Sequence, residues 1–253
     1  SATTFTVNVA VLVESATDCT VTVTLSEAFE ESKPSSSYSS AASSRVVEPP
    51  LPSATVAVTT RPATSSASPT LYSALAGCAA GDWLLVQNET NGLEDLLRGA
   101  AERGVRIALN PSPITPDLAG LPLDLVDCFL LNEIEGAALS GAQRPQEVLD
   151  GLRARYPRAQ IVLTLGENGV RYWDGKTVFA HPIFQVPVVD TTAAGDTFTG
   201  YFLSGLARGL GPAQALEQAS KASSIAVSRK GATASIPKLE EVLAFDKPES
   251  IID

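Results

Sequence analysis

The strongest motif of this chain is the stretch Asp190-Thr191-Thr192-Ala193-Ala194-Gly195-Asp196-Thr197-Phe198. Small residues here precede an apolar helix that we expect over about residues 195–208, so backbone N–H groups of its first turn point at one spot. Together with the partial positive charge of a helix N-terminus, these groups predict an anion site. Asp196 then lies in the first turn, where a carboxylate is suited to accept a proton from an attacking hydroxyl. The alternative is an ordinary helix start that Asp196 merely caps.

The residues around this stretch alternate between strand-like and helix-like patterns. We expect strands at 83–87, 105–109, 128–131 and 161–165, and helices at 93–103, 134–140, 145–155 and 212–228. Such alternation favours a mainly parallel sheet that is covered by helices on both faces. Asp174-Gly175 separates the apolar runs 170–173 and 177–180, which predicts a hairpin and therefore an antiparallel edge. Ligands of such sheets bind beyond the carboxyl ends of the strands.

The chain divides by composition into residues 1–76 and residues 77–253. The first part contains alternating strand patterns at 4–13 and 20–25 and a Ser-rich stretch at 32–44, but no glycine. Because this composition is unusual for a folded domain, its side-chain identities support no site residue. The second part contains the alternating strand and helix patterns, and we expect it to form the nucleotide-binding and catalytic core.

Composition excludes several classes of protein. Of the 253 residues 44% are apolar and 18% are charged, which suits one large domain, or one domain with a small lid. The net charge of −10 disfavours a nucleic-acid partner, because the phosphate backbone is also negative. No apolar run reaches the roughly 18 residues of a membrane span, so no membrane partner is expected. The absence of a signal-peptide pattern and the three widely spaced cysteines favour the cytoplasm.

From about Gly81 to Phe245 the chain resembles the ribokinase-like sugar kinases, also called the phosphofructokinase-B type. The resemblance rests on several segments in the family's order, namely 86–89, 109–113, 132–135, 164–169, 190–198 and 225–232. It implies a three-layer α/β/α fold with a mainly parallel central sheet. It also implies that the N-terminal strands complete the sheet and form a small β lid over the sugar.

The resemblance assigns the catalytic residues. Asp196 corresponds to the family's catalytic base, and the backbone amides of Ala194, Gly195 and Asp196 to an anion hole. Ala193 stands where the usual signature of the family has Gly. The form with Ala is common among ribokinases.

The resemblance also assigns ligand-binding residues, each with a structural alternative. Those for the nucleotide are Asn132, Thr164, Gly166, Gly169 and Ser220, and Glu135 corresponds to a residue that holds Mg²⁺ through water. Helix capping alone could explain Asn132 and Glu135, and the glycines could be ordinary turn residues. Glu89 corresponds to a sugar contact, with a solvated loop residue as the alternative.

A monovalent-cation site, most simply for K⁺, is implied by a further set of residues. They are Asp190, Thr192, Ala226, Arg229, Gly231 and Ser235. The alternative is a helix end and turn in which Gly231 takes a left-handed conformation.

The expected function is that of an ATP- and Mg²⁺-dependent kinase acting on a primary hydroxyl of ribose or a similar small sugar, in a homodimer. Fructokinase, 2-keto-3-deoxygluconate kinase and nucleoside kinase remain open, because the family's N-terminal sugar motifs are absent from this chain. A protein that binds a sugar or nucleotide on the kinase fold without turnover is the alternative from another class.

Overall fold

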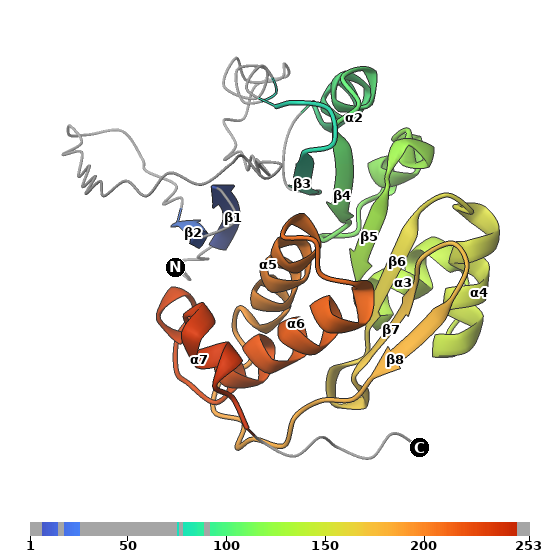
Figure 1. Cartoon of the computed structure of the whole chain (residues 1–253). Helices are drawn as coiled ribbons and strands as arrows, with labels where there is room; N and C mark the ends of the chain where they lie inside the picture. The colour runs from blue at the N-terminus through green and yellow to red at the C-terminus, as the bar shows by residue number, and fades with distance from the viewer. Residues whose placement is uncertain (1–6, 15–17, 26–74, 76–77, 89–91, 247–253) are drawn as a thin grey trace, which may run out of the picture.

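A six-stranded sheet forms the centre of the computed structural model, which describes residues 7–14, 18–25, 75, 78–88 and 92–246 (Figure 1). Its strands are β3 Trp83–Gln87, β4 Arg106–Asn110, β5 Cys128–Leu131, β6 Gln160–Thr164, β7 Val170–Trp173 and β8 Val178–His181, and they lie in that order. Strands β3 to β6 are parallel, whereas β7 and β8 are antiparallel to their neighbours. The carboxyl ends of the four parallel strands therefore meet at one edge of the sheet.

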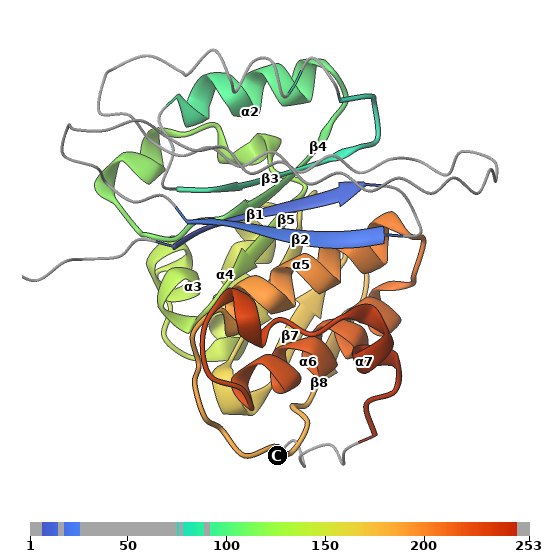
Figure 2. The same cartoon turned by 90° about the vertical axis from the view of Figure 1, so that its left-hand side faces the viewer.

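Helices cover both faces of this sheet, as the alternation of patterns predicts. The helices are α2 Leu93–Glu102, α3 Glu133–Ser140, α4 Pro145–Arg155, α5 Ala194–Ala207, α6 Pro212–Val227 and the short α7 Leu239–Leu243. Helices α2, α3 and α4 pack on one face, and α5, α6 and α7 on the other (Figures 1 and 2). The expected three-layer α/β/α arrangement is confirmed.

Two apolar cores result from the alternation of side chains along each strand. Ile161 and Leu163 of β6 belong to the cluster under α2, α3 and α4. Val162, between them, belongs to the cluster under α5 and α6. All three side chains are fully buried. Strands that are buried on both faces need continuous apolar runs, and this is why these segments read as apolar throughout.

The N-terminal strands differ in part from expectation. β1 Val7–Glu14 and β2 Asp18–Leu25 are present, but they pair with each other in an antiparallel two-stranded sheet. In the described part of the chain they do not extend the six-stranded sheet. Only residues 15–17 separate them, and so short a connection favours a hairpin. β1 contacts α5 (Figure 2).

The turn between β7 and β8 lies at the opposite edge of the sheet from the carboxyl ends of the parallel strands. Asp174 Oδ1 accepts hydrogen bonds from the N–H groups of Lys176 at 2.9 Å and Thr177 at 2.7 Å. Gly175 has φ +96°, and a Cβ atom added there would meet open space. The expected Asp-Gly hairpin is thus confirmed.

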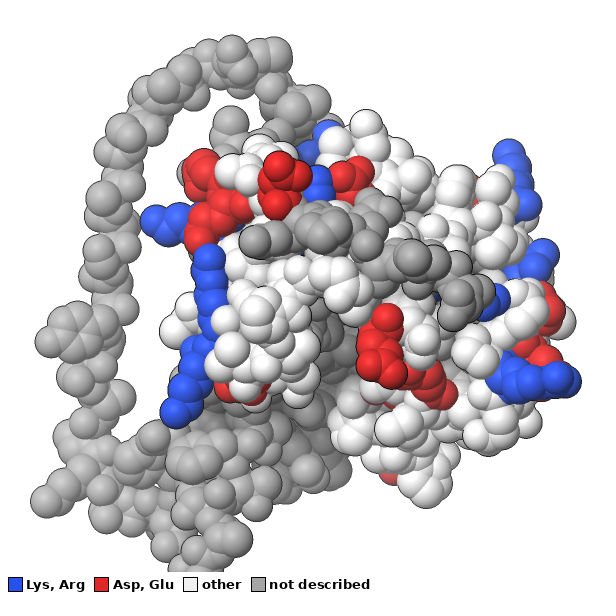
Figure 3. Space-filling model, turned by 90° about the horizontal axis from the view of Figure 1, so that it is seen from below, with Lys and Arg blue, Asp and Glu red and all other residues white. Residues whose placement is uncertain are grey.

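The described surface carries mixed charges. On the face seen in Figure 3, acidic and basic side chains lie next to each other in several places, and no continuous basic area covers its described part. No helix among the described residues is both long and apolar enough to span a bilayer.

Candidate active site

A cavity of about 300 Å³ opens at the carboxyl ends of the parallel strands. Its walls come from the ends of β3 to β6 and from the first turns of α3 and α5. The polar or catalytic-loop residues that line it are Gln87, Asn110, Ser112, Asn132, Glu135, Thr164, Thr191, Ala193, Ala194, Gly195, Asp196 and Thr199. The topology therefore brings together five segments that are far apart in sequence. Asp196 and Glu135 are the titratable residues of this lining.

The start of α5 is shaped by Ala193, which has φ 61° and ψ 11°. It is the one non-glycine residue with positive φ among those described. The N–H of Ala194 donates to Thr191 O at 3.3 Å, and that of Thr197 donates to Ala193 O at 2.9 Å. The N–H groups of Gly195 and Asp196 have no such backbone acceptor in the described chain, as is usual for the first turn of a helix. Two of the three amides expected to form an anion hole are thus available to a ligand.

Asp196 lies half-buried at the cavity wall, in the first turn of α5. Gln87 Nε2 donates a long hydrogen bond of 3.4 Å to Asp196 Oδ1. Burial raises the pKa of Asp196, and the hydrogen bond from Gln87 opposes that rise. A carboxylate of raised pKa beside anion-binding amides is suited to general base catalysis.

Asn132 and Glu135 form a reciprocal capping box at the start of α3. Asn132 Oδ1 accepts from the N–H of Glu135 at 3.1 Å, and Glu135 Oε2 accepts from the N–H of Asn132 at 2.9 Å. Asn132 Nδ2 also donates to Glu135 Oε1 at 3.0 Å. Burial raises the pKa of Glu135, and hydrogen bonds from Asn132 and Ser112 oppose that rise. Both residues thus cap α3, and both also line the cavity, so their assignment to ligands remains a prediction.

The other expected nucleotide residues are only partly gathered at this cavity. Thr164 lines it and donates its hydroxyl to Leu131 O at 3.3 Å. Gly166 and Gly169 lie in the loop after β6 and are not lining residues. Ser220 is buried on α6, away from the lining. Glu89 lies outside the described residues. The assignments of these residues to ligands remain predictions.

Gly169 has a structural reason to be glycine. Its φ is +80°, and a Cβ atom added there would lie 2.2 Å from His181 O at the end of β8. The turn alternative therefore accounts for this residue without a ligand.

The segments expected to hold a monovalent cation lie side by side. Asp190 Oδ1 accepts from the N–H of Thr192 at 2.9 Å, and Oδ2 accepts from the N–H of Gly231 at 2.9 Å. The side chain of Thr192 and these two amides hold the pKa of Asp190 down at about 2. The N–H of Asp190 also donates to Val227 O at 3.2 Å. The loop before α5 is thus bonded directly to the segment after α6.

The remaining residues of that set have other partners. Ala226 is buried, and its carbonyl accepts from the N–H of Arg229 at 3.0 Å. The side chain of Arg229 pairs with Glu241 of α7. Ser235 is buried and donates its hydroxyl to Ala232 O at 2.6 Å.

Sequence reasoning missed three side chains of this region. Gln87 contacts Asp196, Ser112 contacts Glu135, and Ser223 of α6 donates its hydroxyl to Ala194 O at 3.1 Å. Gln87 ends a buried strand and Ser112 follows another, and these positions were a usable signal for a place in the site. Ser223 lies mid-helix among other small residues, where no pattern distinguishes it.

Comparison with known proteins gives one family. The sequence profile described as pfkB family carbohydrate kinase matches residues 53–239. Ribokinase of Staphylococcus aureus is 39% identical over 149 residues, which are 56% of this chain and 48% of that protein. The chain spans about half the length of the curated relatives it matches.

Solved structures give the same picture. Ribokinase of Thermotoga maritima aligns with a TM-score of 0.56 and 33% identity, over 64% of this chain and 56% of that one. Ribokinase of Arabidopsis thaliana, solved in complex with ribose and ATP, aligns with a TM-score of 0.61 and 26% identity. That alignment covers 70% of this chain and 58% of the Arabidopsis chain.

Proposed function

The chain belongs to the pfkB family of carbohydrate kinases, and from that premise we propose that it transfers a phosphoryl group from ATP to a primary hydroxyl of ribose or a similar small sugar. The observation that carries the proposal is the position of Asp196. Its carboxylate lines the cavity in the same helical turn as the unbonded N–H groups of Gly195 and Asp196. A proton acceptor and an anion site are thereby held next to each other.

The proposed chemistry of the chain is a proton transfer with charge stabilisation. The O–H bond of the sugar hydroxyl breaks and its proton passes to Asp196 Oδ2. The oxygen's electron pair forms a bond to the γ-phosphorus of ATP, while the bond from that phosphorus to the β–γ bridging oxygen breaks and ADP leaves with its electron pair. The amides of Gly195 and Asp196, with the N-terminal end of α5, stabilise negative charge on the transferred group. Because burial raises the pKa of Asp196, this carboxylate binds a proton better than an exposed one does.

The residues present fit a bound nucleotide and cation. When bound, Mg²⁺-ATP supplies the phosphoryl group and neutralises part of its charge. No group of three His, Cys, Asp or Glu suited to a metal is found among the described residues. Glu135 lines the cavity and would hold Mg²⁺ through water, as the resemblance implies and in keeping with the reluctance of this ion to lose its hydration shell. Asn132 and Thr164 would line the phosphate side of the nucleotide.

The sugar side and the assembly are proposed on the resemblance alone. Glu89 would contact the sugar, and the β1–β2 sheet beside α5 would serve as a lid that pairs in a homodimer. Fructokinase, 2-keto-3-deoxygluconate kinase, nucleoside kinase and binding without turnover are outcomes of the screen described next.

The proposal is tested with the wild-type protein and the Asp196→Asn variant in a coupled assay of ADP release. The acceptors are pentoses, hexoses, keto-deoxy acids and nucleosides. We expect turnover with a pentose and a kcat in the variant that is lower by a factor on the order of 10² to 10⁴. ATP affinity should change little, because the nucleotide is held by other residues.

Two outcomes would contradict the proposal. Absence of ADP release with every acceptor, despite binding of ATP, would favour the non-catalytic alternative. A near-normal kcat in Asp196→Asn would remove this residue from the proton transfer. Circular dichroism of both proteins controls for a loss of fold.

A second test concerns the monovalent cation. The loop of Asp190 leads into the anion site and is bonded to Gly231, so a cation held there would fix the amides of the first turn of α5. We expect K⁺ to raise kcat relative to tetramethylammonium at equal ionic strength, with little effect on the KM for ATP. Equal kinetics of desalted enzyme in the two salts would contradict the site.

A further inference from the structure

The amide side chain of Gln87, at the end of β3, lines the cavity but was given no part in the proton transfer described above. We propose that Gln87 is a positioning residue for Asp196: its Nε2 group holds carboxylate oxygen Oδ1, which leaves Oδ2 to take the proton of the sugar hydroxyl. This inference rests on the proposed function, because it assigns a role within the same proton transfer. The two residues are 109 positions apart in the chain, and both line the cavity.

Gln87 is held by a rigid part of the fold. It pairs with Asn110 of β4 in the parallel register, and the strand residues before it are buried. The next residue, Asn88, is anchored as well, since its N–H donates to Ser112 O at 3.0 Å and its Nδ2 to Pro113 O at 2.7 Å. A side chain that leaves a strand end fixed in this way can hold a neighbouring group in one orientation.

The surroundings of Asp196 give this contact its importance. The other titratable group that lines the cavity is Glu135 of α3, and both of its oxygens accept hydrogen bonds from Asn132. No Lys, Arg or His belongs to the lining in the described part of the chain. Gln87 is thus the donor that opposes the effect of burial on the pKa of Asp196.

As the hydrogen-bond donor to a catalytic base, the neutral amide of Gln87 is better suited than a cationic side chain would be. The 3.4 Å separation exceeds the usual 2.9–3.0 Å of an N–H···O bond, so the stabilisation of the charged form is modest. An Arg in this place would lower the pKa of the carboxylate far more and make it a weaker base. Gln87 therefore orients Asp196 while leaving its basicity largely intact.

The experiment compares the pH dependence of kcat in wild type, Gln87→Glu and Gln87→Leu. Glu preserves the shape of Gln but places a negative charge beside Asp196, so the pKa of Asp196 rises. Because the ionised form is the active one, the acid limb of the profile should move to higher pH. We expect a move on the order of 0.5 to 1 pH unit in Gln87→Leu and a larger one in Gln87→Glu. On the plateau kcat should fall roughly 10- to 100-fold, with the KM for ATP nearly constant.

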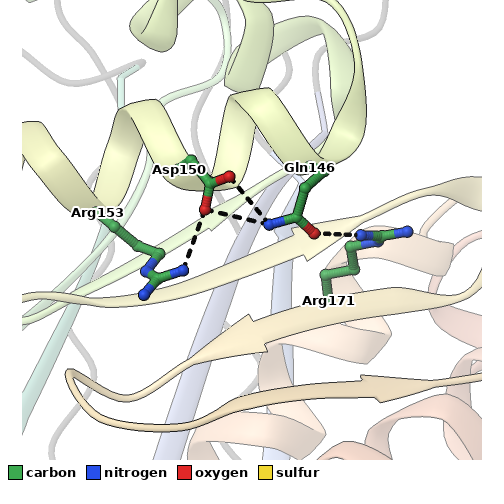
Figure 4. A network of polar contacts seen from close by, with 4 residues as sticks. All are labelled: Gln146, Asp150, Arg153 and Arg171. Carbon is green, nitrogen blue, oxygen red and sulfur yellow. Dashed lines mark hydrogen bonds and ion pairs between the residues drawn. The ribbon is translucent and has the colours of Figure 1, made fainter.

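The matched control is another Gln–Asp contact, on the outer surface of α4. Gln146 Nε2 donates to both carboxylate oxygens of Asp150 at 3.1 Å, in an exposed network with Arg153 and Arg171 (Figure 4). The same two substitutions at Gln146 remove a contact of the same chemistry away from the cavity. They should leave the pH profile unchanged. A wild-type acid limb in Gln87→Glu would overturn the inference.

A second measurement works without turnover. Titration of the ¹³C carboxyl resonance of Asp196, identified by its absence in Asp196→Asn, should give a higher pKa in both Gln87 variants. An unchanged titration would overturn the inference even in a protein without kinase activity. Conversely, failure of the acceptor screen with a shifted titration would reject the proposed function and retain the contact between Gln87 and Asp196.

Discussion

At the scale of the residue, Ala193 sets the direction of the first turn of α5. Its left-handed conformation costs an L-residue roughly 1–2 kcal/mol, and this strain is stored at the start of α5. Ala193→Val should lower the free energy of unfolding by about 2 kcal/mol or more, because a β-branched side chain adopts positive φ still less readily. Urea unfolding measures the change, and kcat should fall with it because the amides of residues 195 and 196 change direction.

Ala193→Gly is the matched control at this position. Glycine accepts positive φ freely but loses more entropy on folding, so the net change should stay within about 1 kcal/mol. Equal stability of the Val and Gly variants would show that the backbone of residue 193 is not strained.

The residues of the site differ in how well the sequence predicted them. The position of Asp196 was predictable, because the start of α5 follows from neighbours within one helical turn. Glu135 was predictable for a similar reason, since Asn132 and Glu135 cap α3 within three positions. The contact of Gln87 with Asp196 was not, because the two residues lie 109 positions apart and only the tertiary fold brings them together. Local sequence patterns thus predict which residues begin the helices of the site, but not the contacts between residues that are distant in sequence.

At the scale of the element, the junction of β6, β7 and β8 depends on Gly169. A Cβ atom at this residue would collide with the backbone of His181, which the pairing of β7 with β8 holds in place. Gly169→Ala should therefore lower the free energy of unfolding by more than about 2 kcal/mol, since a backbone must shift as well as adopt a strained φ. Thermal or urea unfolding measures it.

Gly175→Ala separates the two causes. Gly175 also has positive φ, but its surroundings are open, so only the cost of about 1 kcal/mol for the conformation remains. If Gly169→Ala and Gly175→Ala were equally stable, the short distance between a Cβ atom at residue 169 and the backbone of His181 would not affect the free energy of unfolding.

The bounds of the elements show what periodicity can predict. The expected strands at 83–87, 128–131 and 170–173 coincide with β3, β5 and β7, and the other expected elements of residues 83–228 agree within one residue, whereas the short α7 was not expected. The start of β6 was placed one residue late, because Gln160 is polar and the apolar pattern omits it. It joins the strand through pairing with Cys128, and its side chain accepts from the hydroxyl of Tyr172. Strand pairing uses the backbone and therefore does not require an apolar residue, so hydrophobic periodicity cannot reveal a paired but partly exposed residue such as Gln160.

At the scale of the whole molecule, the same strands contribute side chains to two apolar cores, one on each face of the sheet. Leu163 and Phe202 are fully buried in different clusters, on opposite faces of the sheet. Leu163→Ala should cost about 2–5 kcal/mol and Phe202→Ala about 3–5 kcal/mol, through the cavities left behind. Because both faces share the same strands, each variant should unfold in one transition at lower urea concentration.

Far-UV circular dichroism and tryptophan fluorescence, recorded together, measure this. The tryptophans report on both clusters, since Trp173 belongs to one and Trp83 to the other. Non-coincident curves in either variant would show that the two helical layers unfold separately.

Because the chain reverses direction after β6, the turn between β7 and β8 lies far from the cavity and can be modified without altering it. β7 carries the chain to the edge of the sheet opposite the cavity, and there the Asp174–Thr177 turn closes on its own hydrogen bonds, with open space around Gly175. Exposed turns of this kind tolerate inserted residues well. A dye, an affinity handle or a surface tether placed in this turn would leave the ends of β3 to β6 and the start of α5 facing free solution. The protein thus offers its own attachment point for single-molecule or immobilised assays of the acceptor screen.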